Sequence, residues 1–179
     1  MYHAAGRAIL FTIRKDLPMP FDRDAAKLTV ELARLAYKDD ADAGAGVGAL
    51  NLGEFKFYDG GRSTQAFFAA SATDRYLSFR GTESNNPRDW VVDAKFAPRQ
   101  GALGKVHSGF DEALDEIWTE VAADLTGGDT RPLTITGHSL GGGLAILAAA
   151  RLIAAGSSPA AVYVYGCPRP GLRDFRDEY

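Results

Sequence analysis

The stretch 137–141 is the part of the chain whose residue types and spacing could carry out chemistry. It reads Gly-His-Ser-Leu-Gly, and the small residues on both sides allow a serine to sit on a sharp turn between a strand and a helix. On such a turn the amino end of the following helix directs its amide groups and its positive dipole towards the serine. Ser139 is therefore a candidate nucleophile, and the amide of Leu140 is a candidate donor to the oxyanion of an acyl-transfer intermediate.

A serine hydroxyl is a weak nucleophile at neutral pH, so this chemistry also requires a base, an acid that orients the base, and a second oxyanion donor. The stretch 79–82 reads Phe-Arg-Gly-Thr: a strand ends, a glycine turns the chain, and Thr82 offers both an amide and a hydroxyl group. Thr82 is therefore the candidate second donor. The alternative interpretation is structural, with an ordinary turn after a strand at Thr82 and a glycine-rich turn in which Ser139 is incidental.

The residues around Ser139 predict the elements that would hold it in place. An apolar run at 132–136 is typical of a buried strand, and the apolar run 144–155 predicts a core helix. Residues 160–165 form a further β-rich apolar run, which predicts a buried parallel strand. Apolar residues within 110–125 recur at helical spacing and predict an amphipathic helix before the central strand.

The first half of the chain predicts one helix and a set of short strands, whereas residues 1–20 give no clear pattern. Residues 23–37 carry one apolar and one charged stripe, and Asp22 is a suitable cap for this helix. The stretch 39–53 is rich in Gly, Ala and Asp and is expected to be a flexible loop. Three strands separated by turn residues are predicted next, at 54–58, 65–70 and 76–79. This order predicts an α/β fold with a mostly parallel central sheet.

Composition sets limits on the class of protein. The chain has 179 residues, enough for one domain with a substantial core, and its net charge of -3 with no basic stripe argues against a nucleic-acid partner. A single cysteine excludes an internal disulfide framework. The apolar residues near the N-terminus are too few and too closely bracketed by charge for a signal peptide, and no apolar run is long enough for a membrane span. A cytoplasmic location is therefore favoured.

Five motifs follow one another along the chain at compatible spacing. They are Phe-Arg-Gly-Thr at 79–82, Asp89-Trp90 with Asp93, Val-His-Ser-Gly-Phe at 106–110, Gly-His-Ser-Leu-Gly-Gly at 137–142, and Tyr-Gly-Cys-Pro-Arg-Pro-Gly at 165–171. Together they resemble the class 3 lipases, the fungal-type triacylglycerol lipase family with an α/β-hydrolase fold. The resemblance extends from about Thr64 to Phe175.

The resemblance implies roles for individual residues. Ser139 matches the family's nucleophile, Thr82 matches the residue whose amide and hydroxyl form part of the oxyanion hole, and Leu140 supplies the other amide. Residues 83–93 match the region of the family's lid. Their apolar residues 90–92 are expected either to cover an acyl-binding groove and contact a lipid surface, or to pack on the core.

The chain departs from the family in one respect, because the family's order along the chain is nucleophile, acid and histidine. All three histidines, His3, His107 and His138, precede Ser139, and the aspartates after Ser139 fall before the position expected for the acid. Neighbouring side chains on the elbow point apart, so His138 is not expected to serve as the base. Three explanations remain open: a fragment of a longer lipase, a second chain that supplies the acid and histidine, or a degenerate member that binds lipid or a partner without turnover.

We therefore expect residues 1–179 to form a single α/β-hydrolase domain of the class 3 lipase type that lacks the C-terminal part of the family fold. The expected function is hydrolysis of acylglycerols or similar lipid esters through a serine nucleophile, without a metal or an organic cofactor. The alternative is a catalytically impaired protein that binds lipid or a partner. The strand at 160–165 would be left as an open sheet edge, which favours a homo-oligomer or a complementing chain.

Overall fold

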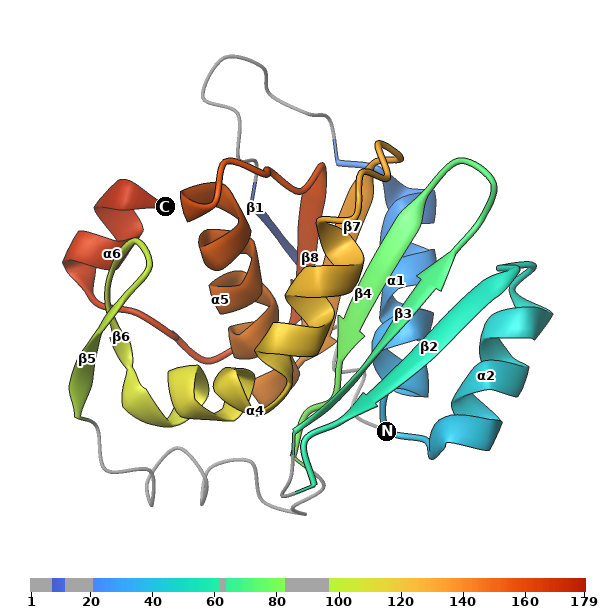
Figure 1. Cartoon of the computed structure of the whole chain (residues 1–179), viewed down its shortest axis with the longest axis horizontal. Helices are drawn as coiled ribbons and strands as arrows, with labels where there is room; N and C mark the ends of the chain where they lie inside the picture. Colours follow the sequence, from blue (N-terminus) through green and yellow to red (C-terminus); the bar gives the residue numbers. More distant parts are fainter. Residues whose placement is uncertain (1–7, 12–20, 62–63, 83–96) are drawn as a thin grey trace, which may run out of the picture.

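The computed structural model describes residues 8–11, 21–61, 64–82 and 97–179, and its centre is a six-stranded sheet (Figure 1). The strands lie in the order β1-β8-β7-β4-β3-β2, and their bounds are Ala8–Phe11 (β1), Glu54–Asp59 (β2), Gln65–Ala70 (β3), Arg75–Phe79 (β4), Leu133–His138 (β7) and Ala161–Tyr165 (β8). The central strands β4, β7 and β8 are parallel, whereas β1, β2 and β3 are antiparallel to their neighbours. The predicted parallel core is confirmed.

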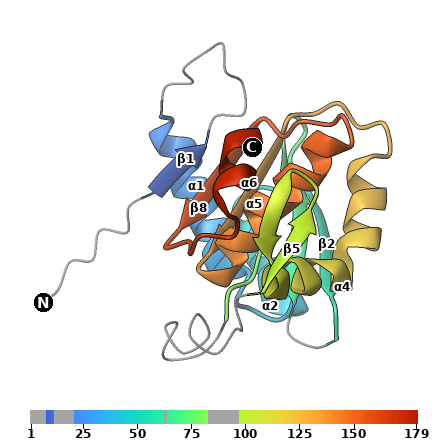
Figure 2. The same ribbon diagram turned by 90° about the vertical axis from the view of Figure 1, so that its left-hand side faces the viewer.

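Helices cover both faces of the sheet, so the described part of the molecule has three layers (Figure 1). On one face lie α1 (Arg23–Leu35) and α2 (Asp40–Ala49), and on the other lie α4 (Ser108–Leu125) and α5 (Leu140–Ala154). A hairpin of β5 (Pro98–Gly101) and β6 (Gly104–His107) lies beside the C-terminal helix α6 (Arg173–Glu178), as Figure 2 shows. The sequence did not predict β5, because its polar residues do not alternate with apolar ones.

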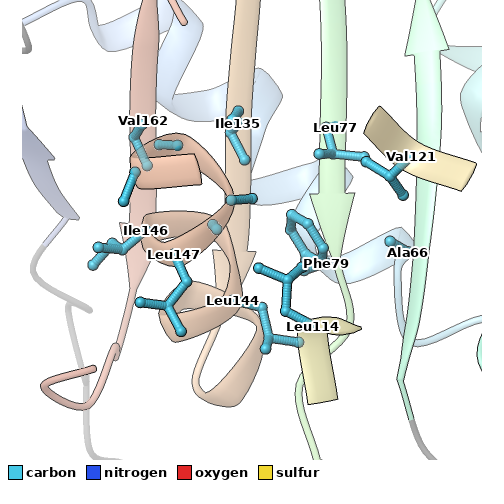
Figure 3. Packing of buried hydrophobic residues seen from close by; sticks show 14 of the residues in the cluster. Ala66, Leu77, Phe79, Leu114, Val121, Ile135, Leu144, Ile146, Leu147 and Val162 are labelled. Carbon is cyan, nitrogen blue, oxygen red and sulfur yellow. The ribbon is translucent and has the colours of Figure 1, made fainter. Parts of the chain in front are cut away.

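The largest apolar core lies between the sheet and the α4–α5 layer (Figure 3). Leu77 and Phe79 of β4 and Ile135 of β7 project into it and are completely buried. Helix α5 is buried along almost its whole length because the sheet lies beneath it and α4 packs beside it. Burial of this kind contributes roughly 25 cal/mol per Å² of apolar surface removed from water, so this core fixes the position of α5 and of the turn before it.

Helix α1 contacts the other face of the sheet through hydroxyl groups as well as apolar side chains. Ser78 of β4 donates to the carbonyl of Leu32 at 3.0 Å, and Thr136 of β7 donates to the carbonyl of Thr29 at 3.2 Å. Asp22 caps the helix by accepting from two amides of its first turn, as predicted. Because these bonds are directional, they set the position of α1 along the central strands.

The expectation of a flexible loop at 39–53 is wrong, because most of this stretch forms α2. The Asp39 side chain caps the helix by accepting from the amide of Asp42 at 2.9 Å. The glycines that suggested a loop permit close packing: a side chain at Gly46 would overlap Leu35 of α1, and one at Gly44 would lie 3.2 Å from Phe55. Tertiary contacts therefore outweigh the low helix propensity of glycine here.

The expectation of an open edge at β8 is also wrong. Strand β1 pairs antiparallel with β8 along the register Ala8↔Tyr165 to Phe11↔Val162, so backbone hydrogen bonds cover this edge (Figure 1). Nothing in the sequence indicated this pairing, because four apolar residues near the N-terminus fit several environments. Strand β8 therefore offers no open edge that would favour a homo-oligomer.

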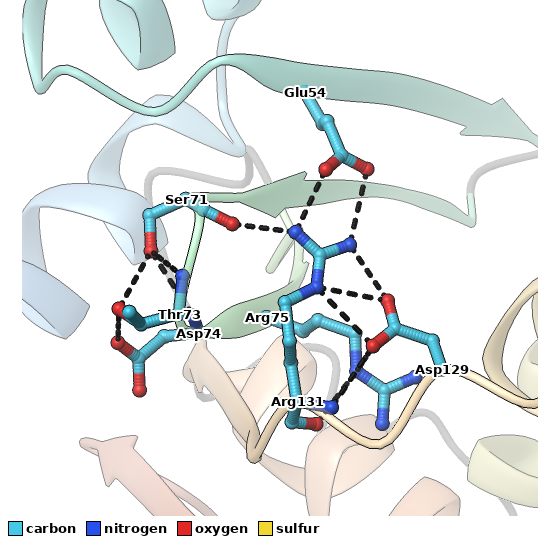
Figure 4. Close-up of polar contacts among 7 residues, drawn as sticks. All are labelled: Glu54, Ser71, Thr73, Asp74, Arg75, Asp129 and Arg131. Atoms are coloured by element: carbon cyan, nitrogen blue, oxygen red, sulfur yellow. Dashed lines mark hydrogen bonds and ion pairs between the residues drawn. The ribbon is translucent and has the colours of Figure 1, made fainter.

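A group of ion pairs occupies the end of the sheet where the parallel strands begin (Figure 4). Arg131, just before β7, binds Asp129 at 2.6 Å and Glu54 of β2 at 2.7 Å. Arg75, at the start of β4, is buried and donates to the carbonyls of Arg131 at 2.9 Å and Leu125 at 3.2 Å. These contacts connect α4 to three strands at the end opposite the candidate site.

Candidate active site

Ser139 lies on the tight turn between β7 and α5, as the sequence predicted. Its φ of +54° and ψ of -122° lie outside the regions that residues with a side chain usually adopt, and Asn51 is the other such non-glycine residue with positive φ in the described ranges. The amide of Ser139 donates to the carbonyl of Tyr165 at 2.9 Å, and its carbonyl accepts from Gly142 at 3.0 Å. Strain of this kind persists only where surrounding contacts enforce it, and it is concentrated at functional sites.

Glycines make this turn sterically possible. A Cβ at Gly137 would overlap the carbonyl oxygen of Gly141, and a Cβ at Gly141 would overlap the carbonyl oxygen of Phe79 at the end of β4. The atoms in the way are backbone, which cannot rotate aside. The glycine pattern of the motif therefore follows from contacts within the turn and with the neighbouring strand, and not from turn formation alone.

Residues 80–82, which follow β4 and are called the Thr82 loop below, lie directly against the turn that carries Ser139. Strands β4 and β7 pair in parallel with Phe79 opposite Gly137, so both chains leave the sheet side by side. A Cβ at Gly81 would lie 2.5 Å from the carbonyl oxygen of His138. The Thr82 Oγ1 atom is buried and has no hydrogen-bond partner within the part of the chain that the structure describes. A buried hydroxyl without a hydrogen-bond partner costs free energy.

His138 and His107 both use Nδ1 in contacts with other parts of the fold. His138 Nδ1 is hydrogen-bonded to the Tyr37 hydroxyl at 2.8 Å, and partial burial lowers the pKa of His138 below its ordinary value. His107 is buried and caps α4, because its Nδ1 accepts from the amide of Gly109 at 3.1 Å. Asp174 is likewise engaged, accepting from the amides of Lys105 at 3.1 Å and Phe175 at 3.0 Å.

Several residues singled out in the sequence lie outside the described ranges. They are the lid-like stretch 83–93, with the motif residues Asp89, Trp90 and Asp93, and His3. Among the described residues, no group of three or more His, Cys, Asp and Glu side chains is arranged to hold a metal ion. None of the described helices has the length and apolar character needed to cross a membrane.

Tyr37 is the residue near the site that the sequence did not indicate. It follows the end of α1, and 101 positions separate it from His138 in the chain. Its hydroxyl also lies where a side chain at Gly81 would point. Only the packing of α1 on the sheet brings these residues together, so spacing along the chain carries no signal for them.

Curated relatives match the part of the chain that contains this site. A secreted mono- and diacylglycerol lipase 1 of Fusarium solani is 40% identical over 102 residues, which are 53% of this chain and 30% of that protein. A lipase of Rhizomucor miehei is 32% identical over 121 residues, covering 60% of this chain and 33% of that protein. The chain thus spans about a third of the length of these relatives.

The names of these relatives correct one expectation. The Fusarium solani protein and a mono- and diacylglycerol lipase A of Penicillium camembertii, which is 34% identical over 102 residues, are both described as secreted. The expectation of a cytoplasmic location is therefore wrong. It rested on the character of the N-terminal residues, which is a weaker indicator than the location of similar proteins.

Solved structures and a family model agree with this similarity. The crystal structure of a lipase from Rhizopus microsporus var. chinensis is 26% identical, with a TM-score of 0.65 over 85% of this chain and 60% of that one. A Rhizomucor miehei lipase propeptide complex has the same fold, with a TM-score of 0.68 at 24% identity over 94% of this chain and 58% of that one. The predicted α/β-hydrolase fold is confirmed. The family model described as lipase (class 3) matches residues 76–179, which include Thr82 and Ser139, and the chain therefore belongs to the class 3 lipase family.

Proposed function

We propose that this chain supplies the nucleophile and the oxyanion donors of a carboxylester hydrolase that acts on acylglycerols or similar lipid esters. One observation carries the proposal: Ser139 is held at a positive φ beside the Thr82 loop, in which a buried hydroxyl has no partner among the described residues. The names of the relatives, which include mono- and diacylglycerol lipases and a rice phospholipase A1, favour glycerolipid esters as the substrate class.

In the proposed reaction, Ser139 Oγ attacks the ester carbonyl carbon and a base accepts its proton. The negative charge on the carbonyl oxygen is stabilised by the amides of Thr82 and Leu140 and by the Thr82 hydroxyl. The ester C–O bond then breaks, and the alcohol leaves with the proton. Water hydrolyses the acyl-serine to give a fatty acid and free Ser139.

The base and its orienting acid are proposed to come from polypeptide other than residues 1–179. His107 and His138 support this assignment because Nδ1, which a triad histidine uses to bind its orienting acid, is bonded instead to the Gly109 amide in His107 and to the Tyr37 hydroxyl in His138. Asp174 supports it because two backbone amides occupy its carboxylate. The acid and the base can belong to a continuation of the same chain or to a second chain, and residues 1–179 are proposed to be part of one domain.

A second candidate function is lipid or partner binding without turnover. It is favoured by the same engagement of both described histidines, since a serine without a base retains only the catalysis due to the oxyanion hole and binding. The two functions differ in the reactivity of Ser139, because a binding protein does not need an activated hydroxyl group.

Covalent labelling separates these functions. The purified chain is treated with a fluorophosphonate and assayed with a short-chain p-nitrophenyl ester, beside Ser139→Ala and, as a control, Ser157→Ala, which changes an exposed serine after α5. We expect fluorophosphonate labelling that Ser139→Ala abolishes and Ser157→Ala retains, and no more than residual ester turnover by this chain alone, because the base and the acid are proposed to lie outside residues 1–179. Absence of labelling from the unaltered chain would contradict the proposed nucleophile and favour the binding function.

Labelling without turnover would support the proposal that the base and its orienting acid lie outside residues 1–179. In that case, addition of a polypeptide that carries the family's acid and histidine region is expected to restore turnover, and again only with Ser139 present.

A further inference from the structure

Tyr37 lies at the junction of the two loops that form the candidate site. Its hydroxyl is 2.8 Å from Nδ1 of His138, the residue before Ser139. The same hydroxyl fills the space where a Cβ at Gly81 would lie, directly before Thr82. One tyrosine oxygen therefore contacts both the turn with the nucleophile and the loop with the second oxyanion donor.

The position of Tyr37 is fixed by the fold behind it. The amide of Tyr37 donates to the carbonyl of Arg34 at 3.2 Å, which continues the last turn of α1. Two strand hydroxyls, those of Ser78 and Thr136, hold α1 on β4 and β7, the strands that lead into the two loops. Tyr37 thus connects α1 to the ends of the strands that α1 packs on.

We propose that Tyr37 is a positioning residue, whose hydroxyl sets the distance between the Thr82 loop and the turn that carries Ser139. The role rests on the proposed function, since this distance matters when both loops bind one oxyanion. An oxyanion hole is effective only when its donors are in place before the reaction. The Tyr37 oxygen enforces this geometry by steric contact with Gly81 and by its hydrogen bond to His138.

As part of this proposal, we assign the donor role in the Tyr37–His138 hydrogen bond to the tyrosine hydroxyl, and this assignment determines the tautomer of His138. A tyrosine hydroxyl that donates to Nδ1 leaves the proton of neutral imidazole on Nε2. This hydrogen bond holds the His138 ring beside Tyr37, in a fixed position next to Ser139. The tautomer of His138 therefore reports on the contact with Tyr37 and does not depend on catalysis.

Tyr37→Phe tests the proposal, with Tyr58→Phe as the matched control. Tyr58 is a buried tyrosine of β2 whose hydroxyl donates to Asp124 at 2.8 Å, on the α4 side of the sheet. Each variant removes one hydroxyl and keeps the ring. We expect Tyr37→Phe to lower the first-order rate constant of fluorophosphonate bond formation about threefold to tenfold, the equivalent of one hydrogen bond, at an unchanged binding constant for the reagent. Tyr58→Phe is expected to leave both constants unchanged.

Nitrogen NMR of the His138 imidazole provides the second measurement. In the unaltered chain we expect the Nε2–H form to predominate, and in Tyr37→Phe we expect a mixture of the two tautomers and a higher pKa of His138, because the donor to the neutral ring is lost. Tyr58→Phe should leave the His138 signals in place.

The labelling rate and the NMR signals separate the proposed function of Ser139 from the positioning role of Tyr37. If the unaltered chain is not labelled at all, the proposed function fails, and the NMR signals still report whether Tyr37 holds His138. Unchanged bond formation in Tyr37→Phe, with the unaltered chain labelled, would overturn the positioning role. Equal losses in Tyr37→Phe and Tyr58→Phe would overturn it as well, because both would then reflect general destabilisation.

Discussion

The two ends of the parallel strands differ in how their polar groups are used. At the end where the strands begin, Arg131 and the buried Arg75 are bound by carboxylates and carbonyls from several elements (Figure 4). At the end where the strands finish, Ser139 has a strained backbone and the buried hydroxyl of Thr82 has no partner within the described ranges. The same sheet therefore has polar side chains with hydrogen-bond partners at one end, and at the other end a strained backbone and a buried hydroxyl without a partner among the described residues.

Under the proposed function, the end where the strands begin contributes to stability and the end where they finish contributes to binding. Hydrogen-bonded ion pairs at the beginning of the strands hold α4 and the turn before β7 in place. The strain at Ser139 and the Thr82 hydroxyl, which has no partner among the described residues, cost free energy that a bound ligand could recover. Removal of a polar group where the strands begin should therefore lower stability, whereas removal of the Thr82 hydroxyl should lower reactivity.

The largest expected effect is that of Gly137→Ala at the site end. The new Cβ would overlap the carbonyl of Gly141 and lie 2.8 Å from the amide nitrogen of Gly142, so the backbone must move. We expect a loss of about 3 kcal/mol or more in the free energy of unfolding, measured by urea denaturation. The control is Gly48→Ala in α2, which has open space around it and should be neutral or stabilising by up to about 1 kcal/mol. Equal behaviour of both variants would contradict the steric explanation of the motif.

Arg75→Met tests the opposite end. The methionine keeps the apolar stem but leaves the carbonyls of Leu125 and Arg131 without this donor. We expect a loss of about 2–3 kcal/mol in the free energy of unfolding, and no change in the fluorophosphonate labelling rate of Ser139 once the protein is folded. A reduced labelling rate at full folding would show that the two ends are coupled, which would break the contrast between them.

Thr82→Val is expected to lower reactivity without lowering stability. Valine has nearly the same shape and removes a buried hydroxyl that lacks a partner among the described residues. We expect the free energy of unfolding to be unchanged or raised by about 1 kcal/mol, while the labelling rate of Ser139 falls about 10-fold or more. Thr82→Ser keeps the hydroxyl and should retain most of the labelling rate. Destabilisation by Thr82→Val would mean that the hydroxyl already has a structural partner.

The smallest expected effect is a loss of stability in acid at the partly exposed ion pair between Arg131 and Asp129. Hydrogen bonds from the Arg131 side chain, followed by the Arg131 backbone amide, lower the pKa of Asp129 to about 2. Because the pKa is lower in the folded than in the unfolded chain, this carboxylate stabilises the fold above about pH 4, and the contribution is lost as pH falls towards about 2. Urea denaturation of Asp129→Asn across this pH range should show a flatter pH dependence than the unaltered chain. Identical pH profiles would exclude the contribution.

Most of the fold could be predicted from the sequence because the periodic elements are strongly patterned. The α4 stretch has apolar residues at helical spacing, and β3 was predicted with its observed bounds of Gln65–Ala70. The failures have a common cause, since α2 and β5 are held by contacts with other elements and not by their own residue patterns. Gly46 packs on Leu35, and Arg99 of β5 binds Asp111 of α4 at 3.2 Å.

The candidate site likewise contains one part that local sequence could predict and other parts that depend on contacts between distant elements. The Gly-x-Ser-x-Gly motif predicted the turn at Ser139, because its glycines are required by steric contacts with residues close in sequence and with one neighbouring strand. The position of Thr82 beside that turn requires the β4–β7 pairing, which the sequence supports only through the order of elements. Tyr37 could not be predicted, since its contacts depend on how α1 lies across the sheet.

The pairing of β1 with β8 has a consequence for the order in which the chain can fold. Ala8 lies opposite Tyr165, so β1 leaves the ribosome long before the strand that it must pair with to close the edge of the sheet. Until then β1 exposes unpaired backbone groups, and closure of so long a loop is slow. During synthesis, nascent chains that end before β8 should therefore bind chaperones that cover strand edges. This binding should end once residues up to 165 have left the ribosome and β8 can pair with β1.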